Sequence, residues 1–398
     1  MPETPIESSF TKSRRFIRTS TQSPSQNFQP PLGRFKINNT CALAMLFCTR
    51  LIFLSPRNSI GDEGLFFWIV IIAISVLLVQ AIVQLLCVKS DARRFPAPGS
   101  LIKTTSGTMH VRQMGSGKPT LVLEAGIAAT SLNWSILQPR LAELTTAYSY
   151  DRAGFGWSPS SGGQCTLQRL SSDLHDLVTA LKPPKPYILI GHSFGAYIVR
   201  VYAQRFPDEL AGVILVDPLT PEEWIRPTSA QRWQLRRGVW FSRAGAVLGS
   251  LGVIRFCLWL LQRGSSAAPR GVLGAFGSKA SETVRRILGE LSKLPPQTMR
   301  LIRERWSNGK FFWTMARYIQ SLPTCAVEAA SCEIPAHIPV TVISGAHQPA
   351  VRMAEHRAIA DHSAQGKHII AAKSAHWVHL DQPELIVAAF SEMAKPKP

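Results

Sequence analysis

The sequence predicts an α/β protein in which helices cover both faces of a mainly parallel sheet and a membrane-spanning helix precedes that sheet. Three observations lead to this prediction. From about residue 96 onward, short β-branched runs alternate with helical patterns, which is typical of parallel strands joined by crossover helices. Residues 219–335 interrupt this alternation with helical patterns alone. Residues 65–88 form an uncharged apolar run before the first expected strand.

The apolar run 65–88 is long enough to cross a bilayer. Its 24 residues carry no charge, and its polar members are Ser75, Gln80 and Gln84. A helix of this length reaches roughly 36 Å, against a hydrocarbon core of about 30 Å. Buried helices of soluble proteins are usually shorter and amphipathic, and a cleaved signal peptide would be shorter and closer to Met1. We therefore predict a single-pass transmembrane helix.

The residues before this run, 1–64, are predicted to form a disordered, basic tail with a short apolar segment. Residues 1–38 are rich in Ser, Thr, Pro and Arg and show a weak similarity to a transit peptide. The apolar segment 41–54 is interrupted by Arg50, and it is either an interfacial segment or the first leg of a membrane hairpin. Positive charge on both sides of the membrane run leaves the orientation open, with a slight preference for an N-terminus inside.

The charge and the cysteine pattern exclude several classes of function. The chain has 44 Lys and Arg against 25 Asp and Glu, a formal net charge of +19, so it is expected to attract an acidic partner. No zinc spacing, helix-turn-helix signature or aromatic-rich RNA motif accompanies this charge, which argues against nucleic acid as the partner. The seven cysteines form no C-x-x-C pair and the ten histidines do not cluster, so we expect no disulfide framework, no metal and no cofactor.

The alternating part of the chain divides into expected strands and helices. The expected strands are residues 109–114, 120–124, 147–150, 187–190, 212–216, 340–343 and 368–371. Five leucines between 167 and 181 recur at spacings of three and four, which predicts one amphipathic helix. Two further helices are expected, one running through about Arg205 and a last one over 383–393.

The insertion 219–335 is predicted to form a helical lid over the ends of the strands. Helical segments are expected around 244–262, 281–291 and 296–307. The insertion holds 17 Lys and Arg against 7 Asp and Glu, and its stretch 247–261 is almost all apolar apart from Arg255. This stretch either packs on the core as an ordinary cap helix or forms a basic, apolar surface against the membrane, and both alternatives stay open.

A short motif after the expected strand 187–190 carries the chemistry. The sequence 191–195, GHSFG, has the pattern G-x-S-x-G, in which a serine sits on a sharp strand-to-helix turn between glycines that let the backbone approach closely. Such a turn exposes the serine Oγ at a helix N-terminus, where a developing oxyanion is stabilised. In this context we predict that Ser193 is a catalytic nucleophile rather than part of a structural turn.

With this motif, the chain resembles the α/β-hydrolase superfamily over roughly residues 92–395. Four blocks carry the resemblance: 121–127 (LVLEAGI), 150–158 (YDRAGFGWS), 191–195 (GHSFG) and 374–383 (SAHWVHLDQP). In order, they resemble the oxyanion-hole turn, the D-x-x-G-x-G-x-S loop, the nucleophile elbow and the histidine loop of that superfamily. The resemblance implies a core built from residues 92–218 and 336–395, with 219–335 as the cap.

The resemblance also implies roles for residues around the serine. A serine nucleophile needs a base, and the base needs a third group to hold its tautomer. His376 matches the catalytic histidine of the superfamily's loop, whereas His379 and His192 correspond to packing or structural positions. The backbone N–H groups of Phe194 and Ile127 would form the oxyanion hole.

The acid of the expected triad is not at its common place. In the common pattern it follows the strand after the cap, three residues beyond a glycine, and there this chain has Gln348, which cannot compensate an imidazolium charge. Some members carry the acid on the strand just after the nucleophile helix, where this chain has Asp217. We therefore predict Asp217 as the acid, with Asp151, Glu124 or no acid as alternatives. Asp151 is expected to tie its own loop together with Arg152.

The sequence therefore predicts a serine hydrolase that cleaves a carboxylic ester through an acyl-enzyme on Ser193. Haloalkane dehalogenases and epoxide hydrolases of the same fold need a carboxylate at that position, so neither fits. The membrane helix and the basic, apolar cap favour a lipid or another hydrophobic ester as substrate, and anionic lipid as a contact of the cap. The alternative is a non-catalytic, membrane-anchored binding module of the same fold, suggested by Gln348 at the usual place of the acid.

Overall fold

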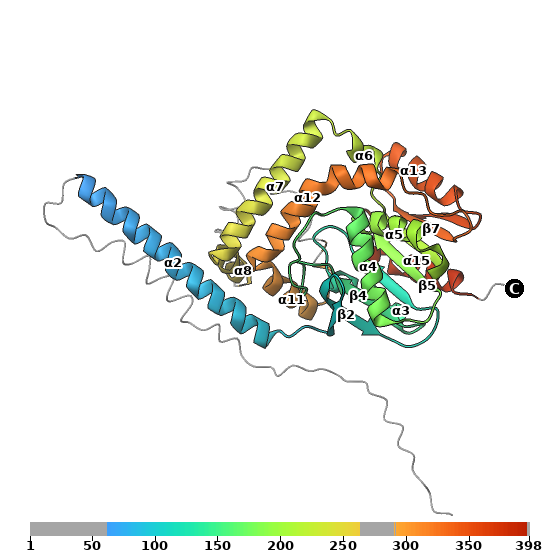
Figure 1. The fold of residues 1–398 in the computed structure, drawn as a ribbon, viewed down its shortest axis with the longest axis horizontal. Coiled ribbons are helices and arrows are strands. Elements are labelled where there is room, and N and C mark those ends of the chain that lie inside the picture. The colour runs from blue at the N-terminus through green and yellow to red at the C-terminus, as the bar shows by residue number, and fades with distance from the viewer. Residues whose placement is uncertain (1–61, 263–289, 291, 396–398) are drawn as a thin grey trace, which may run out of the picture. The chain divides into compact units, whose positions relative to one another are not determined.

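The computed structural model describes residues 62–262, 290 and 292–395, and most of them surround one eight-stranded sheet (Figure 1). The strands are β1 (Ser100–Thr104), β2 (Gly107–Met114), β3 (Leu121–Glu124), β4 (Ala147–Asp151), β5 (Tyr187–His192), β6 (Leu210–Val216), β7 (Val340–Gly345) and β8 (Gly366–Ala371). The predicted apolar segment 41–54 lies outside the described residues, and so does nearly all of the helix expected around 281–291.

The sheet is mainly parallel, as predicted. Its strand order is β1-β2-β4-β3-β5-β6-β7-β8, and only the pairs β1–β2 and β2–β4 are antiparallel among the described strands. The register places Leu123 beside Ile190 and Ile190 beside Ile214, so that β3, β5 and β6 end close together. The carboxyl ends of β3, β5, β6 and β7 therefore meet at one edge of the sheet, where open parallel sheets bind their ligands.

Helices on the two faces of the sheet enclose two apolar cores. On one face lie α3 (Leu137–Ala142) and α15 (Pro383–Met393), and on the other lie α4 (Leu167–Leu181), α5 (Phe194–Arg205) and α13 (Ala350–Asp361). Neighbouring residues of a strand point to opposite faces. Ile188 and Ile190 therefore lie in the core under α3 and α15, and Leu189 lies in the core under α4 and α5. All six residues of β5 are buried, which is why the sequence before the GHSFG motif is a continuous apolar run.

The described cap helices lie between β6 and β7. They are α6 (Glu222–Ile225), α7 (Ser229–Ser250), α8 (Val253–Gln262), α11 (Pro296–Trp306) and α12 (Gly309–Ala330), and α7 packs along α12 (Figure 1). The segment expected around 244–262 is not one helix, because the chain bends by 86° between α7 and α8. The bend falls at Gly252, whose φ of +77° is a conformation that glycine adopts without strain.

Several elements of the fold were not predicted from the sequence, among them α12, β1 and α13. The 22-residue helix α12 contains Pro323, which removes a backbone donor and is normally a sign that a helix ends. The edge strand β1 is mostly exposed and therefore lacks an apolar pattern. In α13 the apolar positions are largely alanines, which give a weak periodic signal.

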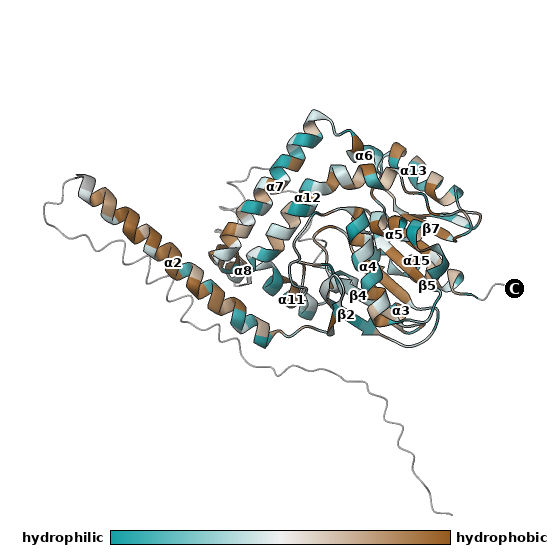
Figure 2. Ribbon diagram, viewed as in Figure 1, coloured by the Kyte–Doolittle hydropathy of each residue, from teal (hydrophilic) through white to brown (hydrophobic). Residues whose placement is uncertain are grey.

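The helix α2 (Asp62–Arg94) extends beyond both ends of the predicted span 65–88. It is long and apolar enough to cross a membrane, and its apolar part is not buried within the protein. Figure 2 shows this apolar character along most of the helix. The helices α7 and α8 form a second candidate span among the described residues only when the bent pair is counted as one segment.

The C-terminal part of α2 contacts the cap through polar side chains. The amide of Gln84 is buried, and its Nε2 donates to the carbonyl oxygen of Ser307 at 2.7 Å. Its Oε1 accepts from Nε of Arg255 at 2.8 Å, and Arg255 also pairs with Asp91 at 2.6 Å. One of the few polar residues in the predicted span therefore joins this helix to α8 and to the residue after α11.

Candidate active site

Ser193 lies at the turn between β5 and α5, where the motif places it. The strand ends at His192 and the helix begins at Phe194. Ser193 has φ 54° and ψ −120°, a conformation that residues with a Cβ rarely adopt. Its N–H donates to the carbonyl oxygen of Val216 at 3.0 Å, which fastens the turn to the end of β6. The serine is thus held at the carboxyl edge of the sheet, directly before a helix N-terminus.

The glycines on either side of Ser193 are required by close packing. A Cβ on Gly191 would lie 2.8 Å from the Cα of Ala196, and a Cβ on Gly195 would lie 2.6 Å from the carbonyl oxygen of Glu124. Both distances are too short for a real side chain, and both neighbours are backbone atoms that cannot swing away. The two glycines therefore allow the start of α5 to pack closely against β5 and against the end of β3.

His376 and Asp217 are hydrogen-bonded to each other. Asp217 follows β6 directly and is fully buried, and His376 lies between β8 and α14 (Val378–Asp381). The distance from Nδ1 of His376 to Oδ2 of Asp217 is 2.6 Å. Because an ionised carboxylate can only accept, Nδ1 carries the proton in this pair, and Nε2 is left free to act as a base. The structure thus brings together two residues that lie 159 positions apart in the sequence.

Asp217 is surrounded by donors. The N–H of Gly345 donates to its Oδ1 at 2.9 Å, and Nε2 of Gln348 donates to its Oδ2 at 2.7 Å. Burial alone would raise the pKa of this carboxyl, but the hydrogen bonds and the charge interaction with His376, together with the Gly345 bond, outweigh burial and hold its pKa below the ordinary value. Asp217 is therefore a carboxylate at neutral pH.

Three histidines gather at this edge, and they differ in accessibility. The ring of His192 packs against that of His376 with centroids 4.8 Å apart, and its Nε2 donates to the carbonyl oxygen of His376 at 2.9 Å. Burial lowers the pKa of His192 to about 3 and that of His379 well below its ordinary value, so both rings are neutral at pH 7. His376 is 31% exposed, whereas the other two are buried. Of the three imidazoles, His376 is the one that a substrate can reach.

The turn after β3 lies against Ser193. A Cβ built on Gly126 would be 3.4 Å from the Cβ of Ser193, so this turn passes close to the side chain of the serine. The guanidinium of Arg152 donates to the carbonyl oxygens of Ala125 and Gly126 and thereby fixes this turn. Within the described residues, neither the N–H of Ile127 nor that of Phe194 donates to a protein acceptor. Two free backbone donors therefore flank the serine.

The other two carboxylates considered for the acid are engaged elsewhere. Oδ2 of Asp151 lies 2.8 Å from Nδ1 of His110, and its Oδ1 accepts from the N–H of Ser131 at 2.7 Å. Glu124 accepts from Tyr150 and Arg152. In the described part of the chain, neither carboxylate is hydrogen-bonded to His376. Asp151 holds its own loop as expected, by accepting from the N–H of Trp157 at 3.0 Å, but Arg152 does not pair with it, because the guanidinium pairs with Glu124.

Gln348 has a contact that the sequence reasoning missed. It was considered only as an unsuitable acid, yet its amide donates to Asp217 and its Oε1 accepts from Nη1 of Arg352 at 2.6 Å. The sequence did contain a signal for this contact. Gln348 occupies the usual place of the acid, where a polar side chain lies near the loop that carries His376. Its chemistry is that of a donor to the carboxylate rather than of a substitute for it.

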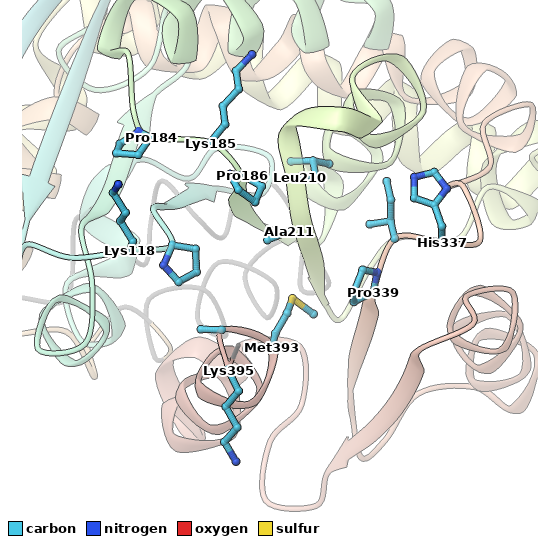
Figure 3. A pocket seen from close by; sticks show the side chains of 13 residues that line it. Lys118, Pro184, Lys185, Pro186, Leu210, Ala211, His337, Pro339, Met393 and Lys395 are labelled. Atoms are coloured by element: carbon cyan, nitrogen blue, oxygen red, sulfur yellow. The ribbon is translucent and has the colours of Figure 1, made fainter. Parts of the chain in front are cut away.

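A separate cavity lies at the opposite edge of the sheet, at the amino ends of the strands. It has a volume of about 550 Å³ and is shown in Figure 3. Its lining residues are Lys118, Pro119, Pro184, Lys185, Pro186, Leu210, Ala211, His337, Ile338, Pro339, Met393, Ala394 and Lys395. Apart from the last three, which lie at the end of α15, these residues precede β3, β5 and β7 or begin β6, whereas Ser193 and Asp217 follow strands. This cavity is therefore not part of the candidate active site.

Metal-binding geometry is not found in the part of the chain that the structure describes. No three or more His, Cys, Asp or Glu side chains there are placed to hold one metal ion. No disulfide bond joins the described cysteines, which are Cys87, Cys165, Cys257, Cys325 and Cys332.

Comparisons with known proteins agree with this architecture. A family model described as the alpha/beta hydrolase fold matches residues 119–240. An uncharacterised protein of Bacillus subtilis, YqjL, is 33% identical over 104 residues, which cover 26% of this chain and 41% of that protein. The matches to this and the next curated relatives span about a third to two fifths of their lengths.

Solved structures give the same result over a larger part of the chain. An alpha/beta hydrolase fold protein from Burkholderia ambifaria is 20% identical with a TM-score of 0.54, and the likeness covers 74% of this chain and 97% of that one. A putative epoxide hydrolase from Pseudomonas aeruginosa is 19% identical with a TM-score of 0.53 and the same coverage. The chain therefore has the α/β-hydrolase fold, which confirms the fold class predicted from the four sequence blocks.

Proposed function

We propose that the protein is a serine hydrolase that cleaves a carboxylic ester through an acyl-enzyme on Ser193. The observation that carries this proposal is the Asp217–His376 hydrogen bond of 2.6 Å, because the same imidazole packs against His192, the residue before Ser193. A buried carboxylate, a partly exposed imidazole and a strained serine at a helix N-terminus are the three groups that activate a hydroxyl as a nucleophile.

In the acylation step, Oγ of Ser193 attacks the ester carbonyl carbon while Nε2 of His376 takes the hydroxyl proton. Asp217 keeps the Nδ1 proton in place and stabilises the imidazolium that forms. The carbonyl oxygen becomes an oxyanion, which the free N–H groups of Phe194 and Ile127 would bind. Collapse of the tetrahedral intermediate breaks the ester C–O bond, and His376 returns the proton to the leaving alcohol.

Deacylation repeats these steps with water as the nucleophile. His376 takes a proton from water, the hydroxide attacks the acyl carbon, and the second tetrahedral intermediate uses the same two donors. Its collapse releases the carboxylic acid and returns the proton to Oγ of Ser193. No cofactor or metal ion is needed at any step, because the residues of the site supply both the nucleophile and the base.

The serine also decides between the two chemistries named among the structural neighbours. An epoxide or haloalkane is opened on this fold by a carboxylate, which forms an ester that water can hydrolyse. Attack by Ser193 would give an ether, and water does not hydrolyse an ether under these conditions. The proposal is therefore acyl transfer to water, even though several structural neighbours are described as epoxide hydrolases.

We further propose that α2 anchors the enzyme as a single transmembrane helix. Many of its large apolar side chains are exposed, which is unfavourable in water and favourable in a bilayer. They are Leu65, Phe66, Phe67, Trp68, Ile69, Val70, Ile72, Ile74, Leu77, Leu78, Val79, Ile82, Leu85 and Leu86. An enzyme held in this way meets esters dissolved in the membrane at high local concentration, which supports a lipid or another hydrophobic ester as the substrate.

The cap is proposed to contact anionic lipid through one face of α7. Trp233, Trp240 and Val247 are spaced by seven residues, so they share one side of the helix, and each is more than half exposed. The helix carries four arginines and no acidic residue. Tryptophan favours the interface of a bilayer and arginine favours its anionic headgroups. Hydrogen exchange of the full chain should show protection of 229–250 in phosphatidylserine vesicles but not in neutral ones, and equal exchange in both would overturn this contact.

The catalytic proposal is tested by labelling with a fluorescent fluorophosphonate, which phosphonylates activated serines. The full-length protein in detergent is expected to react, and Ser193→Ala is expected to abolish labelling while circular dichroism stays unchanged. Ser172→Ala removes a serine from α4, far in the sequence from the site, and serves as the matched control that keeps labelling. Folded wild-type protein that does not react would instead support a membrane-anchored binding module.

A further inference from the structure

The side chain of Gln348 joins the buried carboxylate of Asp217 to a charged pair at the start of the cap. Its Nε2 donates to Oδ2 of Asp217 at 2.7 Å, and its Oε1 accepts from Nη1 of Arg352 at 2.6 Å. The other side of the Arg352 guanidinium donates from Nε and Nη2 to the carboxylate of Glu223, both at 2.7 Å. Together with His376, these residues form one continuous chain of hydrogen bonds.

The residues joined by these hydrogen bonds come from different parts of the fold. Glu223 lies on α6, the first cap helix, and Arg352 lies in the first turn of α13. Gln348 belongs to the loop after β7, and Asp217 follows β6. The bidentate Arg352–Glu223 pair is only partly exposed, so its geometry is well defined. The cap is thereby connected through side chains to the acid of the proposed triad.

This series of hydrogen bonds affects the carboxylate of Asp217 electrostatically. Oδ2 of Asp217 accepts from both His376 and Gln348, so the amide fixes the oxygen that holds the imidazole. The guanidinium on the far side of Gln348 polarises its amide and makes it a stronger donor. Glu223 neutralises the guanidinium, so the pair adds no net charge and His376 faces the charge of Asp217 alone.

We propose that Gln348 and Arg352 are positioning residues that hold Oδ2 of Asp217 on His376, and that Glu223 of the cap balances the charge of Arg352. This inference rests on the proposed function of Ser193. It gives α6, the first helix of the cap, a part in setting the proton affinity of His376. Glu223 acts indirectly, because it is hydrogen-bonded to Arg352 and not to His376.

Substitutions that change the charge of Arg352 or Glu223 distinguish this role from simple packing. The acid limb of the pH profile reports the pKa of the base in the free enzyme. Arg352→Met removes a positive charge, which stabilises the imidazolium and moves the limb to higher pH. Glu223→Gln leaves that positive charge unbalanced, which destabilises the imidazolium and moves the limb to lower pH. Each shift is expected to be about half a pH unit, and the double variant should return close to the wild type.

Three buried histidines close to these residues do not produce the shifts. His192 at the end of β5, His379 on α14 and His356 on α13 are buried. Burial lowers the pKa of His192 to about 3 and that of His356 to about 4, and it lowers the pKa of His379 strongly as well. These rings therefore stay neutral over the range in which His376 is measured.

Two acidic neighbours require a background measurement. Glu355 on α13 has its pKa raised to about 7, mainly by burial, and Glu222 and Glu223 add to this effect. Because Glu355 titrates within the measured range and Glu223→Gln also changes its pKa, the substitutions of Arg352 and Glu223 are measured again in the Glu355→Gln background. The matched control is Arg357→Met, which removes an exposed arginine from the same helix as Arg352 and should leave the profile unchanged.

The experiment measures the second-order rate of fluorophosphonate labelling of the full-length protein from about pH 5 to 9. Gln348→Leu is expected to lower the rate at its optimum by about tenfold, because a hydrogen bond to a charged group is lost. Opposite shifts for Arg352→Met and Glu223→Gln, with recovery in the double variant, support the inference. Shifts in the same direction, absent shifts, or wild-type rates in Gln348→Leu overturn it. Wild-type protein that does not label is a different outcome, because it overturns the proposed function itself. If Arg352→Met does not fold, Glu223→Gln and Gln348→Leu decide the matter.

Discussion

Two aspartate–histidine pairs lie at the carboxyl edge of the same sheet. Asp151 ends β4 and lies 2.8 Å from Nδ1 of His110, and Asp217 follows β6 and lies 2.6 Å from Nδ1 of His376. Both carboxyls are fully buried, and the hydrogen bonds from their histidines help to hold the pKa of both below the ordinary value despite burial. In their immediate chemistry the two pairs are nearly the same.

The pairs differ in what surrounds the imidazole. His110 is 0% exposed and its Nε2 is a buried atom without a hydrogen-bond partner in the described structure, so this ring has no access to a substrate. His376 is 31% exposed and packs against the residue next to Ser193. The comparison teaches that an aspartate–histidine hydrogen bond alone does not mark a catalytic site. The accessibility of the second ring nitrogen, and the group it faces, separate a base from a structural pair.

Replacing each aspartate by asparagine should affect the labelling rate very differently in the two pairs, and this is the largest effect that we expect. Asp217→Asn removes the group that holds the tautomer and balances the imidazolium, so the labelling rate should fall by about 10⁴-fold. Asp151→Asn should leave the rate of the folded protein within about threefold, because Asp151 contacts neither His376 nor Ser193. The two labelling rates are measured side by side on protein that circular dichroism shows to be folded.

The same Asp151→Asn variant should instead lose stability. Asp151 accepts from His110 and from the N–H groups of Ser131 and Trp157, and the asparagine amide turns one acceptor into a donor. We expect the free energy of unfolding to fall by about 3 kcal/mol in chemical denaturation. A rate loss in Asp151→Asn as large as that in Asp217→Asn would mean that both pairs serve the reaction.

A smaller effect concerns the dependence of stability on pH, in which the two pairs should behave alike. Because the folded pKa of Asp151 and of Asp217 lies below the unfolded value of about 3.9, each carboxylate contributes stability that is fully present above that pH. The contribution is lost as the pH falls through the folded pKa. Below about pH 4, each asparagine variant should therefore lose less stability on acidification than the wild type, as measured by denaturation at several pH values. An unchanged slope in one variant would show that its pair does not contribute.

The elements around the nucleophile were predictable because their signals are local. The buried strand β5 is an apolar run, the glycines of GHSFG are demanded by backbone contacts, and α5 follows at once. These signals lie within a few residues of one another, and one sequence suffices to show them. The choice of Asp217 rested instead on the resemblance, because some members of the superfamily carry the acid on the strand after the nucleophile helix, and Asp217 directly follows that strand.

The contacts that the sequence did not reveal depend on distant parts of the chain. Gln348 meets Asp217 across 131 residues, and Arg152 meets Glu124 rather than its neighbour Asp151. The helix α12 forms despite Pro323 because tertiary packing along α7 outweighs the local preference. Partner choice among buried charges is decided by the assembled fold, which is why the hydrogen-bond partners of Asp217 could not be predicted from the sequence.

Ser193 and Asp217 share a backbone property that bears on the stability of the whole molecule. Their φ angles of 54° and 40° favour glycine, which would relieve local strain of about 1–3 kcal/mol at such a position. Glycine would also remove the hydroxyl and the carboxylate that the proposed reaction needs. The native state thus carries a permanent conformational tension at these two points, and the packed sheet on either side must be stable enough to sustain it. Ser193→Gly is therefore expected to abolish the proposed activity and to make the protein harder to unfold, so function and stability oppose each other at this position. At Asp217 the relief of strain is outweighed, because glycine would leave the donors of Gly345, Gln348 and His376 without their acceptor.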